Sequence, residues 1–303
     1  MLENIRLATR KSPLALKQAH IVKDYLLQKG LFKTIDVLPM STSGDTVDSK
    51  VFKNHGGKGL FLKELENALI NGEADIAVHS MKDVPAIVNN KFIVTSIMKR
   101  EDPRDVFISN SYKSIEEVTT GKIGSSSPRR QAIIEHMNKS IDVVELRGNI
   151  NTRIQKLKDL KLDGIILAKA GLSRMGMNHL ITQYLKTEKF VPAPGQGVLC
   201  IQCLREHEYI NKKINKIVDA NTELCVKAER IFASKMNGNC LSPIGAYAEI
   251  KGGFMTLVGF VASIDGNKYI KNKVCGDKKN YRELSVKLAN LFIALGSKRM
   301  LKC

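Results

Sequence analysis

Apolar positions in the first 200 residues follow two spacings in turn. Short apolar runs, as in residues 4–9 and 74–79, are typical of buried strands. Residues 13–29 instead place apolar side chains at helical spacing, behind Ser12 as N-cap and Pro13 at the first helical position. The alternation predicts an α/β fold with parallel sheets. The expected strands cover residues 4–9, 35–40, 74–79, 141–146 and 163–168, with another at Ile123, and the expected helices cover 13–29, 60–71, 128–136 and 151–161.

The pattern changes from about residue 220 onward. A helical stretch over 222–236 is followed by three strand-like runs and a second helical stretch over 280–295. Asp265-Gly266, between the last two runs, has the composition of a hairpin turn. This order predicts an α+β domain with a small antiparallel sheet. The runs cover residues 244–250, 254–263 and 268–274.

Three segments interrupt the regular pattern. Residues 100–104 and the run V-P-A-P-G-Q-G-V at 191–198 have the composition of linkers. Residues 41–59 form a polar, glycine-containing loop of unusual length, and such loops are either functional lids or disordered. The G-G-K-G at its end lacks the spacing of a phosphate-binding loop.

Composition limits the classes of protein and partner. The chain has 303 residues, which predicts more than one domain, and 48 basic against 30 acidic residues give a net charge of +18. This charge indicates a polyanionic partner or a lysine-rich surface. Because there is no Trp, only 6% aromatic residues and no nucleic-acid-binding motif, a nucleic acid is disfavoured. Without a bilayer-length apolar run or a signal-like N-terminus, we expect a cytoplasmic protein that does not bind membranes.

The chain has six cysteines, and two features of them are informative. Cys200 and Cys203 form a C-x-x-C, but they lie in an apolar run with no second pair, which favours structural thiols over redox or zinc chemistry. Cys240 instead lies in a tight loop with Gly238 and Pro243, between a helical and a strand pattern. No metal-ligand spacing is present, so we expect no metal.

Cationic and hydroxyl side chains follow nearly every predicted strand. Ligands of open α/β sheets bind beyond the carboxyl ends of the strands, so these side chains indicate an anion site. Arg129 and Arg130 lie in the first turn of a helix, where the helix dipole disfavours cations unless an anion lies between them. Alternatively, the long side chains of both arginines extend into solvent and no anion lies between them. Arginine pairs with both oxygens of a carboxylate, so we expect a ligand with several carboxylates. The candidates are Arg10, Ser12, Lys82, Ser127, Arg129, Arg130, Arg147, Asn149, Arg153 and Arg174.

Asp83 is an acid among these bases, in the run H-S-M-K-D-V-P. Basic neighbours keep a carboxyl group ionised, and an ionised aspartate can accept N–H donors and stabilise a developing cation. The alternative is a structural salt bridge. His79, at the end of an apolar strand, is expected to be a hydrogen-bonded core histidine.

Eight motifs occur in order along the chain. They are A-T-R-K-S-P-L-A-L, G-G-K-G-L-F-L-K-E-L-E, A-V-H-S-M-K-D-V-P, S-S-S-P-R-R, E-L-R-G-N-I-N-T-R, I-I-L-A-K-A-G-L-S-R-M-G, A-P-G-Q-G and C-L-S-P-I-G-A-Y-A. The set resembles the hydroxymethylbilane synthase (porphobilinogen deaminase) family of the tetrapyrrole pathway. The resemblance covers essentially the whole chain and is specific as a combination.

The resemblance implies a transferase that adds four porphobilinogen molecules to a dipyrromethane cofactor and then releases hydroxymethylbilane by hydrolysis. Cys240 would hold the cofactor through a thioether. Asp83 would be the catalytic carboxylate, bonded to pyrrole N–H groups and stabilising the azafulvene-like cation that remains after loss of ammonia. The cofactor would also be bound by Lys82, Ser127, Arg129, Arg130, Arg147 and Asn149, the substrate by Arg10, Ser12, Arg153 and Arg174, and Lys58 and Asp45 would belong to the lid.

The resemblance also implies three domains in a monomer. Domain 1 would comprise residues 1–99 and 198–216, and domain 2 residues 103–192; both would be α/β domains resembling periplasmic binding proteins. Residues 220–303 would form the α+β domain with the cofactor-attachment loop. One departure concerns the lid, where Asn54 replaces a lysine frequent in the family and Lys53 is the candidate substitute.

Two other functions are compatible with parts of the sequence. A non-catalytic, hinged-cleft binding protein for a polycarboxylate ligand would suit the fold and the arginines, but not Asp83 and Cys240. A nucleic-acid binder would suit the charge of +18. It would bind generic duplex with a steep dependence on salt.

Overall fold

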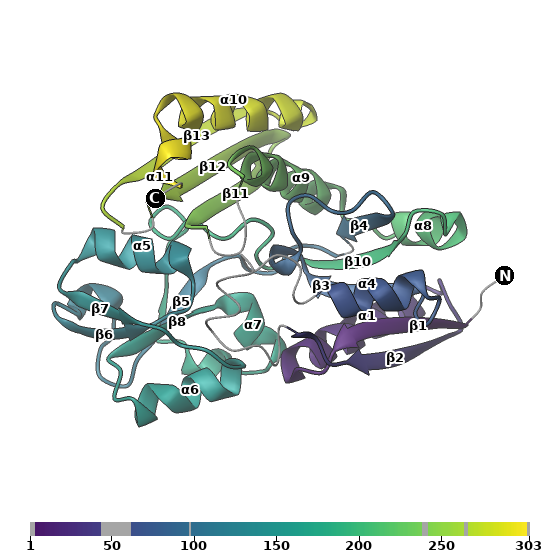
Figure 1. Cartoon of the computed structure of the whole chain (residues 1–303), viewed down its shortest axis with the longest axis horizontal. Helices are drawn as coiled ribbons and strands as arrows, with labels where there is room; N and C mark the ends of the chain where they lie inside the picture. Colours follow the sequence, from purple (N-terminus) through teal and green to yellow (C-terminus); the bar gives the residue numbers. More distant parts are fainter. Residues whose placement is uncertain (1–3, 44–61, 97, 238–241, 264–265, 302–303) are drawn as a thin grey trace. The chain divides into compact units, whose positions relative to one another are not determined.

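The computed structural model describes residues 4–43, 62–96, 98–237, 242–263 and 266–301 (Figure 1). The chain forms two compact units. The first contains Met1–Arg100 and Val198–Glu223, and the second contains Glu101–Gly197 and Leu224–Cys303.

The first unit is built on a five-stranded sheet in the order β2-β1-β3-β10-β4. The strands are β1 (Asn4–Arg10), β2 (Thr34–Met40), β3 (Ile76–Ser80), β4 (Phe92–Ser96) and β10 (Leu199–Leu204). β1 is parallel to β2 and β3, whereas β10 is antiparallel to both β3 and β4. The expectation of a parallel sheet is therefore wrong for β10. Parallel pairing needs a crossover connection, and the chain reaches β10 from the other unit instead.

Helices cover both faces of this sheet. They are α1 (Pro13–Gln28), α4 (Lys63–Ile70) and α8 (Glu208–Asn215). One core cluster contains residues of α1 and α8, and a separate cluster contains residues of α4. The predicted start of α1 is confirmed, because the Ser12 hydroxyl accepts a hydrogen bond from the Ala15 N–H at 3.3 Å. Gly30, just past its end, has φ of 62°, a conformation that favours glycine.

The second unit contains a five-stranded sheet in the order β7-β6-β8-β5-β9. The strands are β5 (Asp105–Ile108), β6 (Gly121–Gly124), β7 (Ile141–Val144), β8 (Gly164–Ala168) and β9 (Gln183–Tyr184). β6 is parallel to β7 and β8, but β5 is antiparallel to β8 and β9. The helices α5 (Pro128–Met137) and α6 (Ile150–Asp159) cover opposite faces, and α7 (Lys169–Arg174) follows β8 (Figure 1).

A three-stranded antiparallel sheet follows in the C-terminal part of the chain. It consists of β11 (Ile244–Lys251), β12 (Phe254–Ala262) and β13 (Tyr269–Asp277), accompanied by α9 (Ala220–Lys235), α10 (Tyr281–Ala294) and α11 (Ser297–Met300). Its core includes Phe232 of α9 and Phe292 of α10, whose rings pack edge to face with centroids 5.0 Å apart. The two mixed α/β sheets and this small antiparallel sheet confirm the predicted fold class.

Burial supports the structural interpretation of the C-x-x-C pair. Cys200 and Cys203 are both buried in β10, and neither forms a disulfide within the described part of the chain. Burial raises the pKa of the Cys203 thiol to about 12, which disfavours the thiolate that redox or metal chemistry needs.

Candidate active site

Predicted site residues of the first unit meet at one edge of its sheet. Because β1 and β3 are parallel neighbours, their carboxyl ends lie at the same edge. Arg10 ends β1 and Ser12 caps the helix that follows it. Lys82 and Asp83 lie in the short 3₁₀ turn that follows β3. The structure therefore brings two cations, a hydroxyl group and a carboxylate to this edge.

The backbone on both sides of Asp83 is anchored. The Met81 N–H donates to the Val198 carbonyl at 2.9 Å, and the Val84 N–H donates to the Met81 carbonyl at 3.1 Å. Met81 and Val84 are buried, whereas Lys82 and Asp83 between them are half-buried. The turn thus presents one cation and one carboxylate from a fixed backbone.

Gln18 is a further residue of this edge, and it was not among the predicted site residues. Its side chain is 4% exposed, and its Nε2 donates to the Ser80 hydroxyl at 2.9 Å. This bond joins α1 to the last residue of β3, directly before the Asp83 turn. A glutamine on the apolar face of the first helix was the available signal.

His79 lies beneath the same edge, in a buried polar chain. Its Nε2 is 2.9 Å from Gln202 Oε1, and Gln202 Nε2 donates to Glu66 Oε1 at 2.7 Å. Burial lowers the pKa of His79 to about 4, so the ring is neutral at physiological pH. The expected core histidine is confirmed.

The second unit has a corresponding edge. β7, β6 and β8 are parallel neighbours, so the segments that follow them lie at one edge of the sheet. Ser127 follows β6 and occupies the N-cap position of α5, where its N–H donates to Ser125 Oγ at 3.3 Å. Arg147 follows β7, and Arg174 ends the helix that follows β8.

The turn from β7 into α6 carries three predicted site residues. Arg147 Nε donates to Glu145 at 2.6 Å, and Arg153 Nε donates to the Gly148 carbonyl at 2.8 Å. Asn149 caps α6, since its Oδ1 accepts from the Thr152 N–H at 3.0 Å. Both arginines are half-buried and Asn149 is exposed, so this turn presents two guanidinium groups at the surface of its own unit.

Arg129 and Arg130 are more deeply buried than Arg147 and Arg153. They are 3% and 5% exposed, and both contact Asp105, which is completely buried. Arg129 Nη2 and Arg130 Nη2 each lie 2.8 Å from one oxygen of this carboxylate. Burial by itself raises the pKa of Asp105, but the two guanidinium groups outweigh it and hold the pKa well below its ordinary value.

The anion expected between the two arginines is therefore present, and it belongs to the chain itself. The alternative, that their side chains reach into water, is wrong. A role of Arg129 and Arg130 toward a ligand stays a prediction. Sequence reasoning missed Asp105, because nothing in D-P-R-D distinguishes it from a surface acid.

Arg174 contacts the segment that leaves the second unit. Its Nη2 donates to the Gly197 carbonyl at 2.9 Å, and the Glu101 N–H donates to the same oxygen at 3.2 Å. Arg174 is half-buried, and burial lowers its pKa. Three other predicted residues, Cys240, Lys58 and Asp45, lie outside the described residues.

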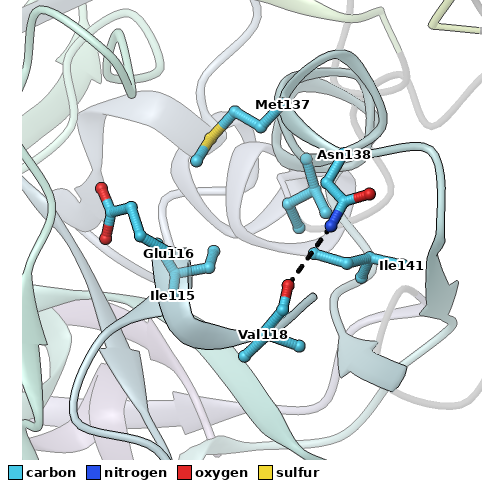
Figure 2. A pocket seen from close by; sticks show the side chains of 7 residues that line it. Ile115, Glu116, Val118, Met137, Asn138 and Ile141 are labelled. Atoms are coloured by element: carbon cyan, nitrogen blue, oxygen red, sulfur yellow. Dashed lines mark hydrogen bonds between the residues drawn. The ribbon is translucent and has the colours of Figure 1, made fainter. Parts of the chain in front are cut away.

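A cavity of about 210 Å³ lies elsewhere in the second unit (Figure 2). Ile115, Val118, Met137 and Ile141 line it, together with Asn138, whose Nδ2 donates to the Val118 carbonyl at 3.3 Å. Ile141 begins β7, and Ile115 and Val118 precede β6. The cavity is thus at the amino ends of the strands, opposite the edge that carries the predicted site residues.

Two features are absent from the described residues, a cluster of metal-binding side chains and a membrane-spanning helix. Among them, no group of three or more His, Cys, Asp and Glu side chains could hold a metal ion. No helix within the same ranges is long and apolar enough to cross a membrane.

Comparisons with known proteins identify the family. Residues 5–212 match the profile "Porphobilinogen deaminase, dipyromethane cofactor binding domain", and residues 223–294 match "Porphobilinogen deaminase, C-terminal domain". A porphobilinogen deaminase of Alkaliphilus metalliredigens (strain QYMF) is 41% identical over 302 residues, covering 99% of this chain and 96% of that one.

Solved structures with similarity to this chain include a periplasmic domain and a methionine binding protein. The periplasmic VFT2 domain of Bordetella pertussis BvgS has a TM-score of 0.43 at 13% identity, covering 71% of this chain and 87% of that one. The methionine binding protein MetQ has a TM-score of 0.44 at 12% identity, covering 71% of this chain and 90% of that one. The two profiles and the 41% identical relative span nearly the whole sequence. The chain belongs to the porphobilinogen deaminase family.

Proposed function

We propose that this protein is a hydroxymethylbilane synthase. It would join four porphobilinogen molecules head to tail on a dipyrromethane cofactor and release the linear tetrapyrrole by hydrolysis. Each addition forms one carbon–carbon bond, breaks the carbon–nitrogen bond of the aminomethyl group and releases one ammonia, whose formation accounts for the proton lost from the pyrrole carbon. The observation that carries the proposal is the 41% identity to a porphobilinogen deaminase over 99% of the chain.

The described residues fit a cofactor that carries carboxylates. Arg147 and Arg153 present guanidinium groups at the carboxyl-end edge of their sheet. Arg129 and Arg130 each keep a buried Nε–H that has no hydrogen-bond partner among the described residues. Most buried polar groups are hydrogen-bonded, so these two donors are available to a carboxylate of the cofactor. When bound, the dipyrromethane supplies the pyrrole carbon to which the first substrate is joined.

Each residue group would have a distinct task. Cys240 would hold the cofactor through a thioether, while its carboxylates would be bound by Lys82, Ser127, Arg129, Arg130, Arg147 and Asn149. Arg10, Ser12, Arg153 and Arg174 would bind the acetate and propionate groups of the substrate. Lys58 and Asp45 would close over the site.

Asp83 would be the catalytic carboxylate. An ionised carboxylate accepts hydrogen bonds from pyrrole N–H groups and stabilises positive charge at the carbon that loses ammonia. The anchored turn around Asp83 supports this role, because a preorganised charge needs no rearrangement when the reaction occurs.

The chain would form three domains, composed of residues 1–99 with 198–216, residues 103–192 and residues 220–303. The protein would act as a monomer in the cytoplasm, with porphobilinogen as its small-molecule partner and without binding nucleic acid or membranes.

Turnover of porphobilinogen tests the proposal. The purified protein should consume the substrate and release one ammonia for each molecule consumed, over many turnovers. A non-catalytic binding protein would instead bind porphobilinogen in a fixed ratio and release no ammonia, and that result would reject the proposed function.

A further inference from the structure

Asp105 is the centre of a buried charged cluster in the second unit. Its Oδ1 accepts hydrogen bonds from Arg130 Nη2 at 2.8 Å and from Gln196 Nε2 at 2.9 Å, and its Oδ2 lies 2.8 Å from Arg129 Nη2. The carboxylate is completely buried, and its three partners are at most 5% exposed. This cluster therefore lies almost entirely outside solvent.

The remaining bonds of the arginines fix their direction. Arg129 Nη1 donates to the Val191 carbonyl at 2.7 Å, and Arg130 Nη1 donates to the Ile166 carbonyl at 2.9 Å. Each guanidinium group thus spans Asp105 and one backbone carbonyl. Both Nε–H groups are left without a hydrogen-bond partner among the described residues, as is Asp105 Oδ2, whose contact with Arg129 is an ion pair.

The charges of this cluster do not cancel. Two guanidinium groups face one carboxylate, which leaves a net charge of +1 in a buried place. Both arginines also lie in the first turn of α5, whose N-terminus adds positive potential. A buried, uncompensated charge is costly and is matched by an opposite charge where one is available. The unpartnered Nε–H groups and the excess charge both indicate an incoming anion.

Gln196 connects the cluster to the linker. Its Nε2 also donates to the Pro103 carbonyl at 2.7 Å, so it joins residues 103–105 to residues 195–197. The neighbouring Gly195 N–H donates to Glu229 of α9 at 2.7 Å. Asp105 is thereby held in place from two linker segments, independently of any ligand.

We propose that Asp105 is a positioning residue for cofactor capture. Its single carboxylate orients the guanidinium groups of Arg129 and Arg130. It also neutralises one of their two positive charges, and the remaining charge attracts a carboxylate of the pyrrole ligand. This inference rests on the proposed function, and it assigns to Asp105 a role in acquiring the cofactor rather than in the condensation itself.

Cofactor acquisition by the apo-protein tests this role directly. The full chain is produced in cells that lack porphobilinogen and is then incubated with porphobilinogen. The covalent mass gain is followed by intact-mass spectrometry, and the Tm of each apo-protein is measured. Three variants are compared: Asp105→Asn keeps the shape but removes the charge, Asp105→Ala leaves space for added formate, and Phe107→Leu weakens the same strand two positions away.

The expected result separates positioning from stability. Asp105→Asn should gain the adduct about 10- to 100-fold more slowly than the wild type, the loss expected when charge-assisted hydrogen bonds are broken. The rate at which Phe107→Leu gains the adduct should stay within about 2-fold of the wild-type rate, even if its Tm falls as far as that of Asp105→Asn. Formate can replace the missing carboxylate, so it should accelerate adduct formation by Asp105→Ala. It should not change the rate of adduct formation by Phe107→Leu.

Other outcomes decide against one proposal or the other. Equal rates for Asp105→Asn and Phe107→Leu at matched Tm would overturn the positioning role. If Asp105→Asn does not fold, the formate series on Asp105→Ala decides, and no acceleration by formate overturns the role. A wild-type apo-protein that gains no adduct would instead reject the proposed function.

Discussion

Asp83 is the residue on which the proposed chemistry depends most. The run H-S-M-K-D-V-P predicted that Asp83 follows a strand and so lies at a sheet edge, but it did not predict the anchored turn. The bonds that hold the turn, from Met81 to Val198 and from Gln18 to Ser80, join segments distant in the chain.

Replacing Asp83 by asparagine should remove most of the activity and little of the stability. The change removes the negative charge but keeps the size of a half-buried side chain. Loss of one charge-stabilising group typically costs about 10²- to 10³-fold in kcat. Initial rates of porphobilinogen consumption check this, with Asp36→Asn on the exposed face of β2 as the matched control. A kcat within about 2-fold of the wild type would exclude Asp83 as the catalytic carboxylate.

His79 should make the protein less stable in mild acid. Its pKa is about 4 in the folded protein and about 6.5 in the unfolded chain, so the unfolded chain binds the proton first as pH falls. The free energy of unfolding should decrease between pH 6.5 and 4 by up to about 3 kcal/mol from this group alone. Urea unfolding at several pH values measures the change. His79→Gln should lack this component, whereas His20→Gln, at an exposed position, should keep it.

Arg129 and Arg130 show how far a single residue's role could be predicted. The helix dipole correctly predicted an anion between the two arginines, but it could not indicate whether a ligand or the chain itself supplies that anion. Asp105 lies 25 residues away from Arg130 in the sequence, on a strand that the hydrophobic pattern did not predict. Only the three-dimensional structure brings the three side chains together.

At the scale of elements, the hydrophobic pattern predicted the long helices and the parallel strands best. Helices such as α1 and α5 have N-cap and Pro signals that define their starts. The pattern did not predict the strands β4, β5, β9 and β10. Short apolar runs carry no period of their own, and their direction depends on where the chain enters the sheet.

Gly164 of β8 lies at a position where the neighbouring strand leaves no space for a side chain. A Cβ atom there would lie 2.1 Å from Cε2 of Phe107, which is completely buried in β5. Gly164→Ala should therefore destabilise the protein by about 1–3 kcal/mol through overpacking, measured by urea unfolding.

A second substitution tests the cause of this loss. Phe107→Leu creates space next to Gly164, so the double variant should lose less free energy of unfolding than the sum of the two single variants. Strict additivity would show that the contact between these two residues is not the reason.

At the scale of the whole molecule, the net charge and the ordered motifs together indicate the partner. The net charge of +18 first suggested nucleic acid, whereas the cations that follow the predicted strands suggested a ligand with several carboxylates. Composition could indicate an anionic partner, and only the ordered motifs could indicate which one. The linkers predicted at residues 100–104 and 191–198 coincide with boundaries of the two units, whereas the return of the chain to the first unit was implied only by the family resemblance.

Ionic strength should affect the binding of the substrate more than the rate of the chemical step. Raising the salt concentration from about 0.05 M to about 0.5 M screens the attraction between a strongly basic protein and a dicarboxylate. The KM for porphobilinogen should rise several-fold while kcat stays nearly constant, as steady-state kinetics at each salt concentration would show. A KM that does not respond to salt would contradict a site built from charged groups.

The intact mass of the denatured protein tests the central claim most directly. Wild-type protein, purified from cells that make porphobilinogen, should exceed its sequence mass by two substrate units, each less one ammonia. Cys240→Ser should show the bare sequence mass. Bare masses for both proteins, with no gain after incubation with porphobilinogen, would contradict a hydroxymethylbilane synthase that carries its cofactor on Cys240.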